Sequence, residues 1–233
     1  EADANTKTVA DEIDSYYAIL IDLQSGKIVA QKNAELVFSP ASMTKVMTLI
    51  LACENLTEED LERQLPLSDD VVQYVTSGAY FGTDCSLPRE SGGYTCIGDT
   101  YTIKDLLYGI GVSSAADCTY MIVKEVAGTE EAFVDMMNAR ARELGMNDTH
   151  FVNCTGLDDD ESAKEHLTSA YDIALMSREL MVNHPDIQKF TTIWMDTLRG
   201  GQTELVNTNK LIRFYKGATG LKTGTTAGAG SCL

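Results

Sequence analysis

The sequence predicts an α+β fold, in which an antiparallel β-sheet takes strands from both ends of the chain and a helical lobe is inserted between them. Residues 17–32 have the pattern of a β-hairpin, residues 102–182 carry several helical patterns, and residues 190–207 are again β-like. The chain has 233 residues and shows no internal repeat or low-complexity linker, so we expect a single domain over residues 1–233.

The chain begins with a predicted hairpin and a predicted helix. Two apolar runs, 17–23 and 28–32, flank a short glycine-containing turn, which is typical of paired antiparallel strands. Pro40 suits the first turn of a helix, because the N–H that proline lacks has no helical partner there. An apolar face at helical spacing follows it, formed by Val46, Leu49, Ile50 and Cys53.

A short helix and a long loop are expected next. Residues 57–66 have the pattern of a capped helix that Pro66 ends. Residues 77–99 are rich in glycine, serine and threonine, which predicts a long surface loop. Cys85 and Cys96 flank its polar, glycine-containing part, and we expect them to form a disulfide if the protein is exported.

The middle of the chain is helical. Residues 102–126 predict a helix that small residues interrupt between 109 and 116. Residues 129–144 begin with an N-cap threonine and an acidic first turn and end at a glycine, and another helix is expected from 168 to about 182. The remaining β-like segments are 190–198, 202–207 and 220–224.

The composition excludes several classes of partner. The formal net charge is −17, which argues against binding to nucleic acid or to an anionic membrane surface. No apolar run approaches the roughly 18 residues of a membrane span, and the polar first residues read like the start of an exported chain whose signal has been removed. The six cysteines have no C-x-x-C pair or histidine cluster beside them. The acidic run 158–161 lacks the spacing of a calcium loop. We therefore expect no metal and no cofactor.

Three stretches carry the chemistry. Ser42 and Lys45 lie three residues apart, so on a helix their side chains are one turn from each other, and the amine can take the proton of the hydroxyl. Such a tetrad alone is more often a surface pair. Small hydroxyl residues break a helix at 112–116, however, and Lys222 lies between two glycines in a β-like segment. In this order the three stretches match the S-x-x-K, S-D-N and K-T-G motifs of penicillin-binding proteins and class A β-lactamases.

The resemblance extends over about residues 16–233. The surroundings of the motifs resemble those of the serine-type D-alanyl-D-alanine carboxypeptidases, the low-molecular-mass penicillin-binding proteins, and the resemblance implies their β-lactamase/transpeptidase-like fold. The stretches that carry it are 38–48, 105–109, 151–158, 166–172, 207–209 and 220–224.

The resemblance also implies catalytic roles. The nucleophile of the family matches Ser42, its general base matches Lys45, and its second serine matches Ser114. Lys45 must be neutral to accept a proton, and both burial and the positive charge of Lys222 favour the neutral amine. Ser114 would relay a proton toward the leaving amine.

The substrate-binding residues follow from the third motif. Lys222 and Thr223 would hold the carboxylate end of the peptide, and the oxyanion hole would be formed by the backbone N–H groups of Ser42 and Thr225. The resemblance thus implies a serine DD-carboxypeptidase that removes the terminal D-Ala from peptidoglycan stem peptides through an acyl-enzyme on Ser42. It would act outside the cytoplasm, and β-lactams would acylate the same serine.

Two features depart from the family pattern. Ala116 stands where the second motif usually has asparagine, so a side-chain amide that would touch substrate and catalytic lysine is missing. Only eleven residues follow Lys222. We therefore expect the domain to lack its last strands, with a carboxylate-binding arginine and a membrane-attaching C-terminal region lying beyond the sequence.

Alternative functions remain open at this point. A class A-like β-lactamase needs a glutamate that activates water, and no E-x-x-L-N stretch lies between the second and third motifs. A catalytically silent binder of wall peptide or β-lactam is favoured only by Ala116. A Ser-His-Asp triad has no supporting pattern around His150, His166 or His184, and His166 is expected to order the loop before its helix.

Overall fold

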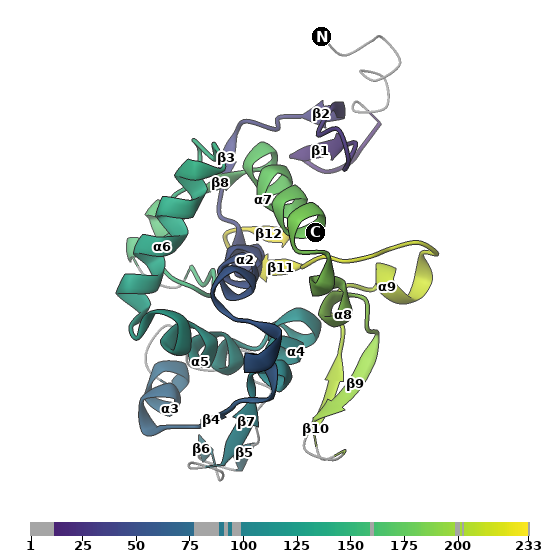
Figure 1. Cartoon of the computed structure of the whole chain (residues 1–233). Helices are drawn as coiled ribbons and strands as arrows, with labels where there is room; N and C mark the ends of the chain where they lie inside the picture. The colour runs from purple at the N-terminus through teal and green to yellow at the C-terminus, as the bar shows by residue number, and fades with distance from the viewer. Residues whose placement is uncertain are drawn as a thin grey trace.

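The structure of the chain is a computed structural model, and it describes residues 12–76, 89–90, 93–94, 99–158, 161–198, 201 and 203–232. Helices make up most of the molecule, and short antiparallel strands lie between and around them (Figure 1). Cys85 and Cys96, and with them the expected disulfide, lie outside the described residues.

The first strands form as expected. β1 (Ala18–Ile21) and β2 (Ile28–Lys32) pair antiparallel, with a register irregularity between Leu20 and Ile21. β3 (Val37–Phe38) leads into a 3-10 turn, η1 (Ala41–Thr44), which continues directly into α2 (Lys45–Asn55).

The expected helix at 57–66 is shorter than the sequence indicated. A 3-10 helix, η2 (Glu58–Glu62), begins with a capping box between Thr57 and Asp60. Pro66 does not end this helix but is the last residue of a strand. That strand, β4 (Gln64–Pro66), pairs antiparallel with β7 (Thr100–Thr102). Proline is tolerated at the end of an edge strand, because the donor that it lacks is not needed there. The elements between them are α3 (Asp69–Thr76), β5 (Arg89–Glu90) and β6 (Gly93–Tyr94).

The middle of the chain is helical, as predicted. The break in the first long helix falls at residues 114–115, between α4 (Ile103–Ser113) and α5 (Ala116–Ala127). Thr102, Thr129 and Ser169 cap the helices that follow them, since each side chain accepts a backbone N–H of the first turn. The elements are α4 (Ile103–Ser113), α5 (Ala116–Ala127), α6 (Glu130–Glu143), η4 (Glu161–Glu165), β8 (Thr168–Ser169) and α7 (Ala170–Asn183).

The last part of the chain has shorter strands than predicted. Residues 190–191 still belong to a helix, so the strand expected at 190–198 begins only at Met195, and the strand expected at 220–224 begins at Gly224. The elements are η5 (Pro185–Ile187), α8 (Gln188–Thr191), β9 (Met195–Leu198), β10 (Thr203–Val206), α9 (Leu211–Phe214), β11 (Gly224–Thr226) and β12 (Gly230–Cys232).

The α+β class and the antiparallel pairing are confirmed. Within the described residues the strands form six two-stranded ladders, and none of these joins β1 or β2 to β11 or β12. β1 instead packs against α7, and β11 packs against η1.

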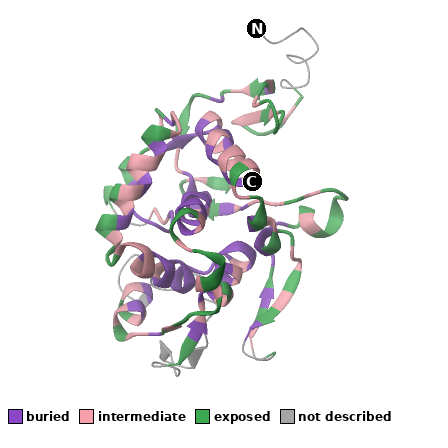
Figure 2. Cartoon of the chain, viewed as in Figure 1, coloured by how far each residue is buried: buried purple, intermediate pink, exposed green. Residues whose placement is uncertain are grey.

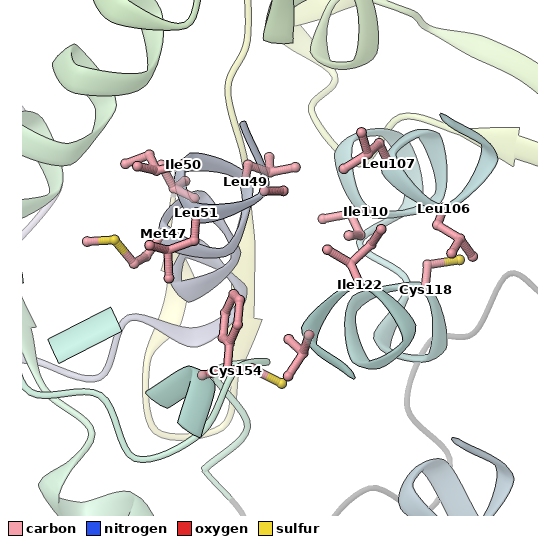
Figure 3. Packing of buried hydrophobic residues seen from close by; sticks show 14 of the residues in the cluster. Met47, Leu49, Ile50, Leu51, Leu106, Leu107, Ile110, Cys118, Ile122 and Cys154 are labelled. Atoms are coloured by element: carbon pink, nitrogen blue, oxygen red, sulfur yellow. The ribbon is translucent and has the colours of Figure 1, made fainter. Parts of the chain in front are cut away.

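The core surrounds α2, which lies among α5, α6 and α7 (Figure 1). Figure 3 shows side chains of α2, among them Leu49, facing Leu107 and Ile110 of α4 across the core. Leu49, Ile50 and Ile110 have no exposed surface, and burying such a side chain contributes roughly 1.5–3 kcal/mol. Buried residues cover α2 and the inner sides of α4 and α5, whereas exposed residues lie on the outer elements (Figure 2). The turn before α2 is therefore continuous with a helix that is buried in the core. No helix in the described part of the chain has the length and apolarity to cross a membrane.

Candidate active site

The side chains of Ser42 and Lys45 are in direct contact. The amine of Lys45 donates a hydrogen bond to the hydroxyl of Ser42, with an Nζ–Oγ distance of 2.9 Å. Ser42 lies in the 3-10 turn η1 and Lys45 follows that turn, and side chains three residues apart eclipse one another in a 3-10 helix. Lys45 is only 3% exposed, so its amine is shielded from water. This arrangement can transfer the proton of a serine hydroxyl to a lysine.

The amine of Lys45 also donates to the backbone carbonyl of Thr155, at 3.0 Å. This carbonyl is set by Asn153, whose Oδ1 accepts the N–H groups of Thr155 at 3.2 Å and of Gly156 at 2.7 Å. The other end of the Asn153 amide donates to the carbonyl of Leu157 at 3.0 Å. This role of Asn153 was not predicted from the sequence. The available signal was an asparagine followed closely by glycine, because asparagine side chains often accept a backbone N–H two residues on in a turn.

Ser114 occupies the break between α4 and α5. It caps α4 in the left-handed conformation, with φ 62°, which is uncommon for a residue other than glycine and is often found at functional sites. Ser114 is 8% exposed and lines the same groove as Ser42. Ala116 is the first residue of α5 and is 3% exposed.

Lys222 and Thr223 precede β11 instead of lying within a strand. Lys222 is 4% exposed and donates to the carbonyl of Thr223 at 2.7 Å, while the hydroxyl of Thr223 donates to that of Thr208 at 2.6 Å. Asn209 holds the start of this segment, because its side-chain amide donates to the carbonyl of Gly220 at 2.8 Å.

β11 packs directly against η1, the turn that contains Ser42. A Cβ placed on Gly224 would lie 3.0 Å from the backbone nitrogen of Ser42, so only glycine allows this approach without a shift. Thr225 is the next residue of β11. The close approach of β11 to η1 brings the backbone of Ser42 and Thr225 to one groove, which both residues line.

The groove has a volume of about 500 Å³. Ser42, Ser114, Thr223 and Thr225 line it, together with residues 208–211 and the end of β12. The structure therefore brings these four sequence-predicted residues to one surface, and Lys45 and Lys222 lie buried and bonded to Ser42 and to the backbone of Thr223. A groove of this size accommodates a short peptide.

Asp158 connects the loop after Thr155 to the β11–β12 turn. Its Oδ2 accepts the hydroxyl of Thr226 and the N–H of Gly228, the latter at 3.2 Å. The first carboxylate of the acidic run 158–161 thus accepts two hydrogen bonds from the β11–β12 hairpin.

The histidines do not form a triad with Ser42 in the described residues. His166 is fully buried and bonds Thr44 and Val152. Burial lowers its pKa from 6.5 to about 4, repulsion from His150 adds to this effect, and the carboxylate of Asp158 opposes it. His184 lies 3.7 Å from a carboxylate oxygen of Glu54, on the far end of α2 from Ser42.

Among the described residues one group could offer three metal ligands, Glu54, Glu179 and His184. The guanidinium of Arg140 lies between the two carboxylates, 2.7 Å from an oxygen of each. The two carboxylates thus share one cation of the protein itself.

Comparison with known proteins identifies the family of this chain. The chain matches the family described as D-alanyl-D-alanine carboxypeptidase, Peptidase S11, over residues 4–233. It is 37% identical to the D-alanyl-D-alanine carboxypeptidase DacF of Bacillus subtilis over 231 residues, which are 98% of this chain and 54% of that protein. The chain thus spans about half the length of this curated relative.

Solved structures agree. A protein of Streptococcus pneumoniae described as a peptidoglycan synthesis regulatory factor (PBP3) has a TM-score of 0.79 and 31% identity, covering 94% of this chain and 60% of that one. Penicillin-Binding Protein D2 of Listeria monocytogenes in its cefotaxime-bound form has a TM-score of 0.75 and 28% identity, covering 94% and 82%. The fold is that of the penicillin-binding proteins. The chain belongs to the D-alanyl-D-alanine carboxypeptidase family, Peptidase S11.

Proposed function

We propose that the protein is a serine DD-carboxypeptidase that removes the terminal D-Ala from peptidoglycan stem peptides. The observation that carries the proposal is the 2.9 Å contact between Lys45 Nζ and Ser42 Oγ at the edge of the groove. The family supports the reaction and the substrate class. Residues 1–233 would form one catalytic domain, and because its substrate is cell-wall peptide, the protein would act outside the cytoplasm.

In the proposed acylation Ser42 Oγ attacks the carbonyl carbon of the penultimate D-Ala while its proton passes to Lys45. The backbone N–H groups of Ser42 and Thr225 stabilise the oxyanion, because such preorganised donors act where negative charge develops. Ser114 relays a proton to the departing amine, and the C–N bond breaks to release D-Ala. Lys222 and Thr223 hold the carboxylate of this leaving residue. Water then hydrolyses the ester and returns the proton to Ser42.

β-Lactams are proposed to acylate the same serine. We expect penicillin to add covalently to Ser42, because in the described residues this serine has the amine of Lys45 within hydrogen-bond distance. Intact mass followed by peptide mapping checks the site, and Ser42→Ala serves as the control that takes no label. Mapping of the adduct to Ser114 would overturn the assignment. Steady release of D-Ala from a stem-peptide analogue then tests the peptidase itself.

The rival functions separate in the same assays. A β-lactamase would turn penicillin over, whereas a peptidase holds it as a slowly hydrolysed ester. A silent binder would take penicillin but release no D-Ala.

Ala116 allows a direct test of the silent-binder alternative. We expect the protein to release D-Ala as it stands, and Ala116→Asn to change the rate only modestly, by less than about tenfold. Losing one preorganised hydrogen bond typically costs about 3–4 kcal/mol, so backbone groups or water must replace much of the missing amide. If the wild type releases no D-Ala and Ala116→Asn restores release by about a hundredfold or more, Ala116 is an inactivating change and the binder is correct.

A further inference from the structure

Both ring nitrogens of the buried His166 are used. Its Nε2 lies 2.7 Å from the hydroxyl of Thr44, and its Nδ1 accepts the backbone N–H of Val152 at 3.0 Å. A backbone N–H only donates, so Nδ1 carries no proton. The ring is therefore the neutral tautomer with its proton on Nε2, from which it donates to Thr44.

The two bonds of His166 end on the two segments that hold Lys45. Thr44 lies in η1 between Ser42 and Lys45, and its side chain is fully buried. Val152 leads into the loop whose Thr155 carbonyl accepts the amine of Lys45. A single imidazole thus connects the turn that carries the nucleophile to the loop that orients the base, although it lies 122 residues from Thr44.

We propose that His166 is a positioning residue for acylation: its neutral imidazole fixes η1 against the loop 152–157 and so maintains the contact between Ser42 and Lys45. The inference rests on the proposed function, since it assigns His166 a role only if Ser42 is the nucleophile and Lys45 its base. His166 itself does not contact the groove.

Protonation of His166 would break this connection. An N–H on Nδ1 would face the N–H of Val152, donor against donor, and the imidazole could no longer join the two segments. The titratable groups that act on the ring are His150 and Asp158, of which the first disfavours and the second favours the charged form. With a pKa of about 4, the ring is neutral at pH 7 and becomes charged only in acid.

Three variants test the proposal at pH 7. His166→Ala removes both bonds. We expect the first-order rate of penicillin acylation to fall about 10- to 100-fold, because small displacements at a reacting centre slow a reaction by such factors. The dissociation constant of the non-covalent complex should change little. His166→Gln has an amide that can donate to Thr44 and accept from Val152, and should recover most of the rate. His150→Gln makes the same substitution at the exposed neighbour and should acylate like the wild type.

The pH dependence of the acylation rate distinguishes a positioning role of His166 from a role in folding alone. It also tests the proposal if His166→Ala does not fold. The acylation rate of the wild type relative to His166→Gln should be constant at neutral pH and fall below about pH 4, by about tenfold per pH unit. Superimposable profiles of the folded proteins, or a folded His166→Ala with the wild-type rate, would overturn the role of His166. If the wild type takes no penicillin at all, the proposed function fails instead, before His166 is tested.

Discussion

Replacing Lys45 with alanine is expected to slow penicillin acylation of Ser42 by about 10²- to 10⁴-fold, the usual contribution of a positioned general base. The amine donates to Ser42 at 2.9 Å and is buried, so no water can easily take its place as the proton acceptor. The measurement is the rate at which the intact mass shifts by one penicillin. D-Ala release should fall in parallel.

Two further variants show whether Lys45 acts as a base or only as a charge. Lys45→Arg keeps a cation that cannot lose its proton in a protein, so it should be as slow as Lys45→Ala. Lys189→Ala removes an exposed lysine paired with Asp186 and should acylate normally. An active Lys45→Arg would show that positive charge at this position is sufficient, and the general-base role would be wrong.

The parts of the site that local sequence specifies could be predicted. The contact between Ser42 and Lys45 follows from a spacing of three residues on a helical turn, and the break at Ser114 follows from small residues inside an apolar helix. The N-cap of the helix at 129–144 was predicted for the same reason, because Thr129 accepts the N–H of a residue only three positions away. Thr102 and Ser169 cap their helices in the same way.

The parts that depend on distant contacts could not be predicted. The carbonyl of Thr155 lies 110 residues from Lys45 in the chain, and Asp158 lies 68 residues from Thr226. Periodicity and capping say nothing about such pairs. Pro66 was misassigned for a similar reason: it ends β4, a strand that exists because β7 pairs with it, and this tertiary partner outweighed the local helix signal.

Gly156 leaves no room for a side chain beside η1, and Gly156→Ala is expected to slow acylation about a hundredfold. A Cβ on Gly156 would lie 1.7 Å from the carbonyl oxygen of Ala41 and 2.7 Å from the hydroxyl of Thr44. Real atoms cannot approach a backbone oxygen so closely, so either η1 or the loop must move. Movement of the loop withdraws the Thr155 carbonyl from Lys45, and movement of η1 displaces Ser42 itself.

Gly145→Ala is the matched control for this prediction. Gly156 and Gly145 both have positive φ, 82° and 76°, but a Cβ on Gly145 would meet nothing within 4 Å. Both substitutions carry the left-handed backbone penalty of about 1–2 kcal/mol, and only Gly156→Ala adds the collision. Denaturant unfolding should therefore show a larger loss of stability for Gly156→Ala, and penicillin acylation should be slowed in that variant alone. Equal stabilities together with equal acylation rates would mean that the loop yields without disturbing Lys45, and the Thr155 carbonyl would then have no part in orienting the base.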